Sequence, residues 1–493
     1  MSAPPRPWPA LAALCVGYFL VILDMTVVSV ANPAIMTSLR ADVTSLVWAT
    51  SSYLLTFAAL LLPAGRLGDR FGPRPVYLAG LAVFTGASLW CGLSGDIGTL
   101  IAARAVQGVG AALLTPQTMA VISRTFPPER RAAAMSVWGA VAGLANLLGP
   151  LLGGLVVDRA GWEWIFHANL PIGLLGLVLA VRYVPVLPTR PHRFDTVGLV
   201  LSTVGMAALV LGLQEGGSRG WTTWTWCATG AGLAVLALFV VHQTRTAADP
   251  LLPLGIFRDR TFAAASLAVA LAAAAVTAVM VPLYLYLEEA RALSGTGAGA
   301  VLAPMAVAAI VFVPLVGLLG DRLHPRTVPL VGLVLFAASL AAFAALMTLD
   351  LPLGWFLAGA ALAGLANACI WPSLAVAATL RLPADRAGAG SGAYNALRQV
   401  GSVLGSAAVS AVLASRLAAH GLTDGLADGP AHGPAAGGTG AAPSALSAAL
   451  AETVYLPVGL LLLGALAASL IVRSSPPPRQ PDGSASPSLA VTP

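Results

Sequence analysis

Long apolar runs separated by short polar stretches make up most of this chain. Each run has about 20 residues, the length at which an α-helix crosses a bilayer, and a helix satisfies its own backbone hydrogen bonds in lipid. Fourteen runs fit this description, near residues 10–33, 46–65, 76–94, 99–122, 132–156, 163–184, 196–214, 222–242, 262–287, 297–319, 328–348, 353–379, 388–415 and 452–472. The pattern therefore predicts an all-α polytopic membrane protein with 14 transmembrane helices and both termini on one side.

The composition favours a chain embedded in the membrane over a soluble protein with one anchor. Of 493 residues, 58% are hydrophobic and only 9% are charged, whereas a soluble domain carries about 25% charged residues. The net charge of +6 comes from arginines scattered over short loops, so no nucleic-acid partner is expected. Lysine is absent while alanine and glycine abound, which we interpret as GC-rich coding and hence a bacterial origin. The cysteines are far apart in apolar stretches and predict neither a disulfide nor a metal site.

The arginines predict which side of the membrane each loop faces. With the N-terminus inside, the inner segments carry 19 arginines and the outer segments carry 5, while Arg104 and Arg398 lie within helices. This bias fits the positive-inside rule and argues against a miscount by one span. We therefore expect both termini in the cytoplasm and the protein in the inner (plasma) membrane. The N-terminus lacks the cleavage site of a signal peptide, so the first apolar run is expected to be retained.

Two stretches rich in Gly, Ala, Ser and Pro have a composition that cannot build a core. Residues 416–451 are predicted to form a flexible extracellular loop, and residues 473–493 a disordered cytoplasmic tail. Asp424, Asp428 and His432 in the loop are metal-ligand types, but a solvated loop is the favoured interpretation. No metal and no other cofactor are expected.

A repeated motif divides the chain into two related halves. GRLGDRFGPR at 65–74 recurs as GLLGDRLHPR at 317–326. Repeated halves around a central cavity are how secondary transporters are built. Chance similarity between apolar segments is the alternative, and the shared charged loop argues against it. The predicted domains are a cytoplasmic N-terminus (1–9), an N-terminal six-helix bundle (10–184), two inserted helices with their loops (185–261) and a C-terminal six-helix bundle (262–472).

Asp24 and Arg104 are ionisable residues inside apolar runs. A carboxylate there costs about 2.5–3.5 kcal/mol on insertion scales, so Asp24 is expected to face a polar cavity and to have a function. A tolerated polar residue packed inside a bundle is the alternative. Arg104 shares a helix face with Gln107 and keeps its proton, so it needs acceptors or water. We hypothesise that Arg104 helps Asp24 to release a proton; a structural role, in which Arg104 ties helices to backbone carbonyls, is the alternative.

Six motifs follow one another along nearly the whole chain. They are LDMTVVSVANP (23–33), WATSSYLL (48–55), ARAVQGVGAALLTP (103–116), WEWIFHANLPIG (162–173), PLLPLGIFRDRTF (250–262) and SGAYNALRQVGSVLG (391–405). In order and spacing they resemble the major facilitator superfamily, specifically its fourteen-helix drug:proton antiporter branch. The resemblance implies two pseudo-symmetric six-helix bundles, the major facilitator fold, with two helices inserted between them. Asn32 departs from the usual leucine and adds a polar group.

The loop between the second and third helices carries the first copy of the repeated motif. Its glycines allow a tight turn, and its aspartate can pair with an arginine or with a helix N-terminus. The resemblance implies a gating latch on the cytoplasmic side, which breaks when the transporter switches state. A topology anchor made of positive charge is the alternative. The predicted latch residues are Gly65, Gly68, Asp69, Arg70, Gly72 and Arg74, with Asp321 and Arg322 in the second copy.

AVAGLANLLGPLLGG at 140–154 resembles the fifth-helix motif of antiporters, with Ala145 in place of the usual glycine. Small residues let another helix approach closely, and a proline bends the helix. A bend that suits exchange and ordinary small-residue packing are equally good interpretations. The predicted antiporter-helix residues are Gly149, Pro150, Gly153 and Gly154.

Several polar and aromatic side chains within the apolar runs are candidates to line a substrate cavity. Each has an alternative in core packing, interfacial anchoring or hydrogen bonds between helices. Glu288, Glu289 and His167 are also unusual, and positions near the outer interface without a specific role are the favoured interpretation for them. The predicted cavity residues are Asp24, Asn32, Tyr53, Gln107, Asn146, Tyr284, Asn395 and Arg398.

Together these features predict proton-coupled efflux of apolar or amphipathic small molecules, such as drugs or antibiotics, by alternating access. The chain has no phosphate-binding loop, so ATP is not the expected energy source, and no catalytic arrangement predicts an enzyme. The expected partners are a small-molecule substrate, protons and the lipid bilayer, and the protein is expected to be monomeric. A proton-coupled transporter of one specific metabolite, or a membrane sensor that does not transport, are the alternatives.

Overall fold

The computed structural model describes residues 7–189, 195–219, 222–245, 250–320, 323–349, 351–383, 386–422 and 443–472. This part of the chain is helical without strands, and 14 of its helical segments are long and apolar enough to cross a membrane. The predicted fold class and number of spans are confirmed. Several predicted features lie outside the described residues, namely Asp321, Arg322, Asp424, Asp428, His432 and the tail 473–493.

The N-terminal helices pack with one another. Asp96 starts α4 by accepting a hydrogen bond from the backbone N–H of Thr99 at 2.9 Å, as an N-cap residue does. Gly72 joins α2 to α3 with φ of 93°, a conformation that favours glycine. The bundle comprises α1 (Pro7–Leu39), α2 (Val43–Phe71), α3 (Pro73–Gly92), α4 (Ile97–Thr125), α5 (Pro128–Ala160) and one span broken into α6 (Glu163–His167) and α7 (Asn169–Tyr183).

Two further helices, α8 (Thr196–Arg219) and α9 (Thr223–Arg245), pack on each other, and α8 also contacts α2 and α14. Asp195 caps α8 by accepting from the Gly198 N–H at 2.7 Å. Its carboxylate also meets His242 Nε2 at 2.9 Å and accepts from Gln243 Nε2 at 2.7 Å. One carboxylate therefore ties the start of α8 to the end of α9.

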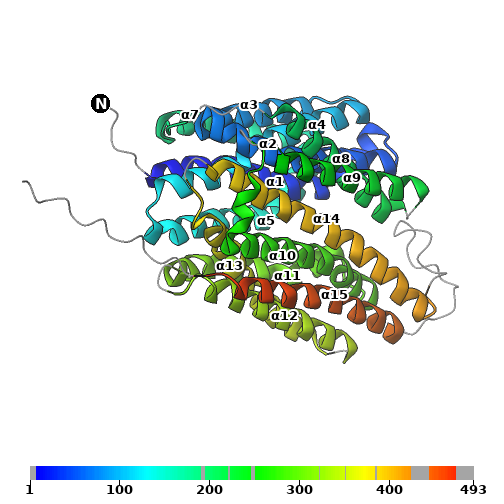
Figure 1. Cartoon of the computed structure of the whole chain (residues 1–493). Helices are drawn as coiled ribbons and strands as arrows, with labels where there is room; N and C mark the ends of the chain where they lie inside the picture. Colours follow the sequence, from blue (N-terminus) through cyan, green and yellow to red (C-terminus); the bar gives the residue numbers. More distant parts are fainter. Residues whose placement is uncertain are drawn as a thin grey trace, which may run out of the picture.

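The C-terminal helices form the second group, and α14 crosses between the two groups in Figure 1. The predicted loop 416–451 is too long, because α14 ends at Ala419 and α15 begins at Pro443. Its last residues are alanine-rich and buried, which favours helix over loop. The group comprises α10 (Arg260–Leu285), η2 (Tyr286–Ala290), α11 (Gly295–Gly320), α12 (Thr327–Thr348), α13 (Leu353–Thr379), α14 (Ala387–Ala419) and α15 (Pro443–Ser469).

The two groups meet closely at the end of the molecule that holds the loop 65–74, which we call the arginine-rich end. A Cβ placed on Gly65 of α2 would overlap the carbonyl oxygen of Gly388 in α14. In the second half of the repeat, a Cβ on Gly317 of α11 would overlap the Ser136 side chain of α5. Each copy of the repeated glycine therefore allows its helix to pack closely against the opposite group, so the two copies have equivalent roles in the fold.

Candidate functional site

Asp24 and Arg104 form a buried ion pair, with Arg104 Nη1 2.5 Å from Asp24 Oδ2. The other carboxylate oxygen accepts hydrogen bonds from Gln107 Nε2 at 2.8 Å and from Asn169 Nδ2 at 3.3 Å. The guanidinium also lies 4.3 Å from the centre of the Tyr53 ring, within cation–π range. The carboxylate thus has charge-assisted donors on both oxygens, which is how a charge survives burial.

This network lies inside the N-terminal bundle, on elements α1, α2, α3, α4 and α7. Asp24 is 3% exposed and Arg104 is 1% exposed. The expectation that Asp24 faces a polar cavity is therefore not met in this structure. The physical reason is that donors from α4 and α7 satisfy both carboxylate oxygens, so the buried charge is compensated within the protein.

A central cavity of about 510 Å³ lies between the two groups of helices. A second cavity of about 310 Å³ adjoins it and shares part of its wall, including Tyr18, Thr26, Asn146, Trp371 and Arg398. Two residues of α14, Tyr394 and Arg398, line the central cavity. They come after Gly388 and Gly392 in the sequence, the residues at which α14 packs against α2. The cavities therefore lie beyond the interhelical contacts of the arginine-rich end, toward the opposite end of the bundle.

Aromatic side chains form much of the cavity wall and are held in place. Tyr18 of α1 and Trp138 of α5 stack with centroids 4.5 Å apart at 28°. The indole N–H of Trp371 donates to Asn367 Oδ1 at 2.8 Å, and Asn367 in turn donates to the Ala363 carbonyl at 2.9 Å. The aromatic part of the wall is thus fixed in place before a ligand binds.

Only some of the predicted cavity residues line these cavities. Asn146, Tyr284 and Arg398 do so. Asn395 is buried and donates to the Ser391 carbonyl of its own helix at 2.9 Å. Among the residues that the structure describes, the others do not line either cavity: Asp24, Tyr53 and Gln107 belong to the buried ion-pair network, and Asn32 lies farther along α1.

The carboxylate of Asp69 joins the two groups of helices at the arginine-rich end. Its oxygens accept hydrogen bonds from the backbone N–H groups of Gly388 and Ala389, each at 2.7 Å. These two residues open α14, so the carboxylate sits at a helix N-terminus, where the helix dipole favours a negative charge. Asp69 is 4% exposed. The structure thus places a helix N-terminus from the opposite half of the chain against Asp69, and arginines interact with it as well.

The other residues of the first latch copy have structural contacts of their own. Arg74 donates to the Val181 carbonyl at 2.5 Å, and the Arg70 guanidinium lies 5.2 Å from the centre of the Phe71 ring. Among the described residues, the cations that interact electrostatically with Asp69 are Arg66 and Arg124. A Cβ on Gly68 would overlap the side-chain oxygen of Gln117, so this glycine permits the α2–α4 contact.

The antiporter-helix residues lie on α5, which packs along α1. A Cβ on Gly149 would overlap the side chain of Thr26, a residue that lines both cavities. Gly153 is less constrained, since its nearest neighbours, atoms of Val27, would lie at 3.5 Å, and Gly154 has still more room. Pro150 lies in the same helix. The close approach to α1 thus depends on Gly149.

Two members of the ion-pair network, Asn169 and Ser88, are not among the residues predicted from the sequence. Asn169 begins α7 and Ser88 lies in α3, and Ser88 Oγ accepts from Gln107 Nε2 at 2.8 Å. A buried amide in an apolar run was the signal available for Asn169. Glu288 and Glu289 are exposed in η2, and His167 packs against Gly92 and the Trp164 ring.

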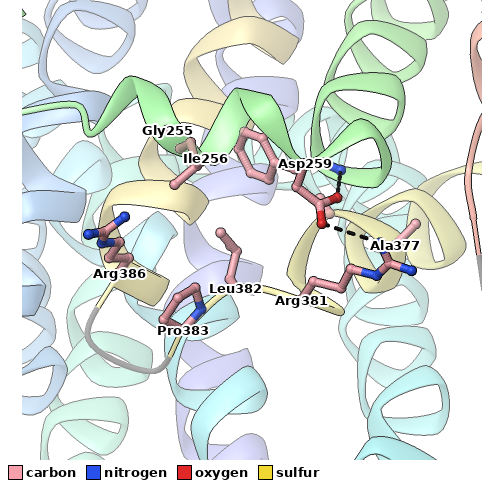
Figure 2. Close-up of a pocket in the computed structure, with 10 residues that line it drawn as sticks. Gly255, Ile256, Asp259, Ala377, Arg381, Leu382, Pro383 and Arg386 are labelled. Carbon is pink, nitrogen blue, oxygen red and sulfur yellow. Dashed lines mark hydrogen bonds and ion pairs between the residues drawn. The ribbon is translucent and has the colours of Figure 1, made fainter. Parts of the chain in front are cut away.

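A smaller pocket of about 160 Å³ lies away from the central cavity, between η1 (Leu254–Arg258) and the link from α13 to α14. Figure 2 shows Asp259 turned toward Arg381, with an Oδ2 to Nη1 distance of 3.5 Å, while Arg386 lies on the far side. Asp259 also caps α10 by accepting from the N–H groups of Thr261 and Phe262. These charges join the inserted segment to the C-terminal group, so we assign the pocket a structural role.

Comparison with known proteins places these features in a family. The Major Facilitator Superfamily profile matches residues 14–406. An uncharacterised MFS-type transporter of Mycobacterium tuberculosis is 46% identical over 81% of this chain and 69% of its own length. The tetracenomycin C resistance and export protein of Streptomyces glaucescens is 33% identical over 81% of this chain and 74% of its own.

A solved structure shows the same fold. The proton:xylose symporter XylE, bound to 6-bromo-6-deoxy-D-glucose, has a TM-score of 0.65 at 14% identity, covering 93% of this chain and 94% of its own. The profile match spans most of the chain and agrees with the helical architecture. This multi-pass membrane protein therefore belongs to the Major Facilitator Superfamily, a family of transporters and not of enzymes.

Proposed function

We propose that this protein exports apolar or amphipathic small molecules across a bacterial inner membrane in exchange for protons. The observation that carries the proposal is that α1 bears both a buried carboxylate in an ion pair and a residue of the cavity wall. Asp24 of this helix is held by Arg104, and Thr26, two residues on, lines the cavity. A relative whose name joins resistance with export supports the outward direction.

In this mechanism Asp24 exchanges protons and α1 carries the signal. Protonation from the outer side removes the charge that Arg104 pairs with, and loss of one partner in a buried pair costs about 3–5 kcal/mol. The cost is relieved when α1 shifts against α4, which moves Thr26 at the cavity wall. Release of the proton to the cytoplasm then accompanies loading of the substrate. The substrate shifts the equilibrium only as far as it binds one state better than the other.

The latch contact supports an alternating-access cycle. The arginine bias predicts that the end holding Asp69 faces the cytoplasm. The bonds from Gly388 and Ala389 hold that end closed in the present state. Breaking these bonds separates α2 from α14 and opens the cavity inward.

The test is an assay in inverted membrane vesicles that follows proton movement when a compound is added. We expect the wild type to exchange protons for at least one member of a chemical panel, and Asp24→Asn to exchange none. Asp158→Asn, which removes an exposed carboxylate from α5 outside the network, is the matched control and is expected to behave as wild type. Uphill export by Asp24→Asn at the wild-type rate would refute the proposed coupling.

A further inference from the structure

The wall of the central cavity carries a single charge. Across both adjoining cavities, Arg398 of α14 is the one charged side chain among the described residues that line them. The nearby acids do not line the wall: Asp24 is paired with Arg104 inside the N-terminal bundle, and Glu288 and Glu289 lie in η2 beyond the end of α10, where Glu288 interacts electrostatically with Tyr284 of the wall. The cavity that would hold a substrate is therefore electropositive.

Arg398 also lacks an internal partner. Within the described part of the chain, its guanidinium has neither a hydrogen bond nor an ion pair. An unpaired charge at membrane depth is costly, and a guanidinium cannot escape the cost by losing its proton. A ligand that brings an anionic oxygen would relieve that cost through one or two charge-assisted hydrogen bonds. Asn146 lines the same two cavities and adds an amide that can donate or accept.

The rest of the wall suits a flat apolar body. Tyr18 and Trp138 form one stacked pair, and Trp371 is fixed by its bond to Asn367. Aromatic faces favour stacking with a planar ligand, and fixed side chains lose little entropy when it binds. The volume of about 510 Å³ is within the usual range of pockets for small molecules.

We propose that the ligands of this cavity are planar aromatic molecules that bear an acidic group, a carboxylate or phenolate, and that Arg398 binds this group. The inference rests on the proposed function for its role in export. A cationic amphiphile is therefore not the preferred ligand. The Arg398 guanidinium repels a positively charged ligand, and no carboxylate on the cavity wall counteracts this repulsion.

Binding to the purified full-length protein in nanodiscs tests this without requiring transport. The probes are 9-anthracenecarboxylate, its methyl ester and 9-(aminomethyl)anthracene, which share one ring system and differ in charge. Fluorescence titration gives their dissociation constants for the wild type, Arg398→Gln and Arg398→Lys. Arg416→Gln is the matched control, since it removes the same charge from the exposed end of α14, where Arg416 pairs with Glu452 at 3.2 Å.

We expect the wild type and the Arg416 variant to bind the carboxylate at least about tenfold more tightly than the amine, with the ester between them. In Arg398→Gln the dissociation constants of the three probes should differ by no more than about threefold. In Arg398→Lys the carboxylate should still bind most tightly and the amine most weakly, but with smaller differences, because lysine keeps the charge without the planar fork. Equal or tighter binding of the amine to the wild type, no saturable binding of the carboxylate, or an unchanged preference in Arg398→Gln would each overturn the inference. If Arg398→Gln does not fold, the wild-type series and Arg398→Lys decide.

Vesicle export separates this inference from the proposed function. Charge-selective binding without proton-coupled export would support the proposed ligand class and refute the proposed export function. The opposite outcome is export that favours the amine and is unchanged in Arg398→Lys. It would support the proposed export function and refute the acidic substrate class.

Discussion

Asp69→Asn is the sharpest perturbation of the contact that closes the arginine-rich end. The carboxylate accepts two backbone N–H bonds at 2.7 Å each, from Gly388 and Ala389. Asparagine offers one acceptor oxygen, so its amide group faces the second N–H as a donor. One charge-assisted bond, about 1.5–3 kcal/mol, is lost, and a buried N–H is left unsatisfied. We take the combined loss as about 2–4 kcal/mol, which lowers the closed-to-open ratio at this end by roughly 30- to 1000-fold.

Pulsed electron paramagnetic resonance measures this shift directly. Spin labels at Phe71→Cys and Pro383→Cys, both exposed at the arginine-rich end, report the separation of the two halves in a cysteine-free background. We expect Asp69→Asn to add a long-distance population and to slow vesicle transport. Asp96→Asn is the control, because Asp96 caps α4 within one bundle and asparagine caps as well as aspartate. An unchanged distance distribution together with an unchanged transport rate would show that Asp69 is not a latch.

Three further predictions test the network, the helix contact and the insert. Arg104→Lys keeps the charge but loses the Nε–H bond to the Ala49 carbonyl and the planar guanidinium that lies over the Tyr53 ring, so proton-coupled export should fall in vesicles while insertion is retained; normal coupling would remove the guanidinium from the mechanism. Gly149→Ala should lose about 1–3 kcal/mol against unfolding through overlap with α1, whereas Gly153→Ala should be near neutral, and equal thermal shifts would contradict this. Burial alone would raise the pKa of Asp195, but its hydrogen bonds outweigh burial and hold the pKa below its ordinary value. Its stabilisation is therefore present above about pH 4 and lost as pH falls through the folded-state pKa, so the stability gap between wild type and Asp195→Asn should narrow on acidification, and a gap independent of pH would refute this.

The number of spans and the repeat could be predicted because they depend on local properties. A run of about 20 apolar residues is helical in lipid whatever surrounds it, since the backbone has no other partner there. Gly65 and Gly317 recur in the sequence, and in the structure both seat a helix against the opposite half. The boundaries of the loop 416–451 were less predictable, because alanine-rich segments form helix when they are packed.

Tertiary structure alone decided which partner each functional side chain meets. Asp24 and Thr26 are two positions apart on one helix, about 200° around its axis, and so they face different neighbours. The sequence determined that a buried carboxylate needs compensation. Only the packing of α4 and α7 against α1 decided that Arg104, Gln107 and Asn169 supply it in place of the cavity. Likewise, the two backbone N–H groups that donate to Asp69 lie 319 and 320 residues away, and no local pattern specifies a contact made by the folding of two separate halves.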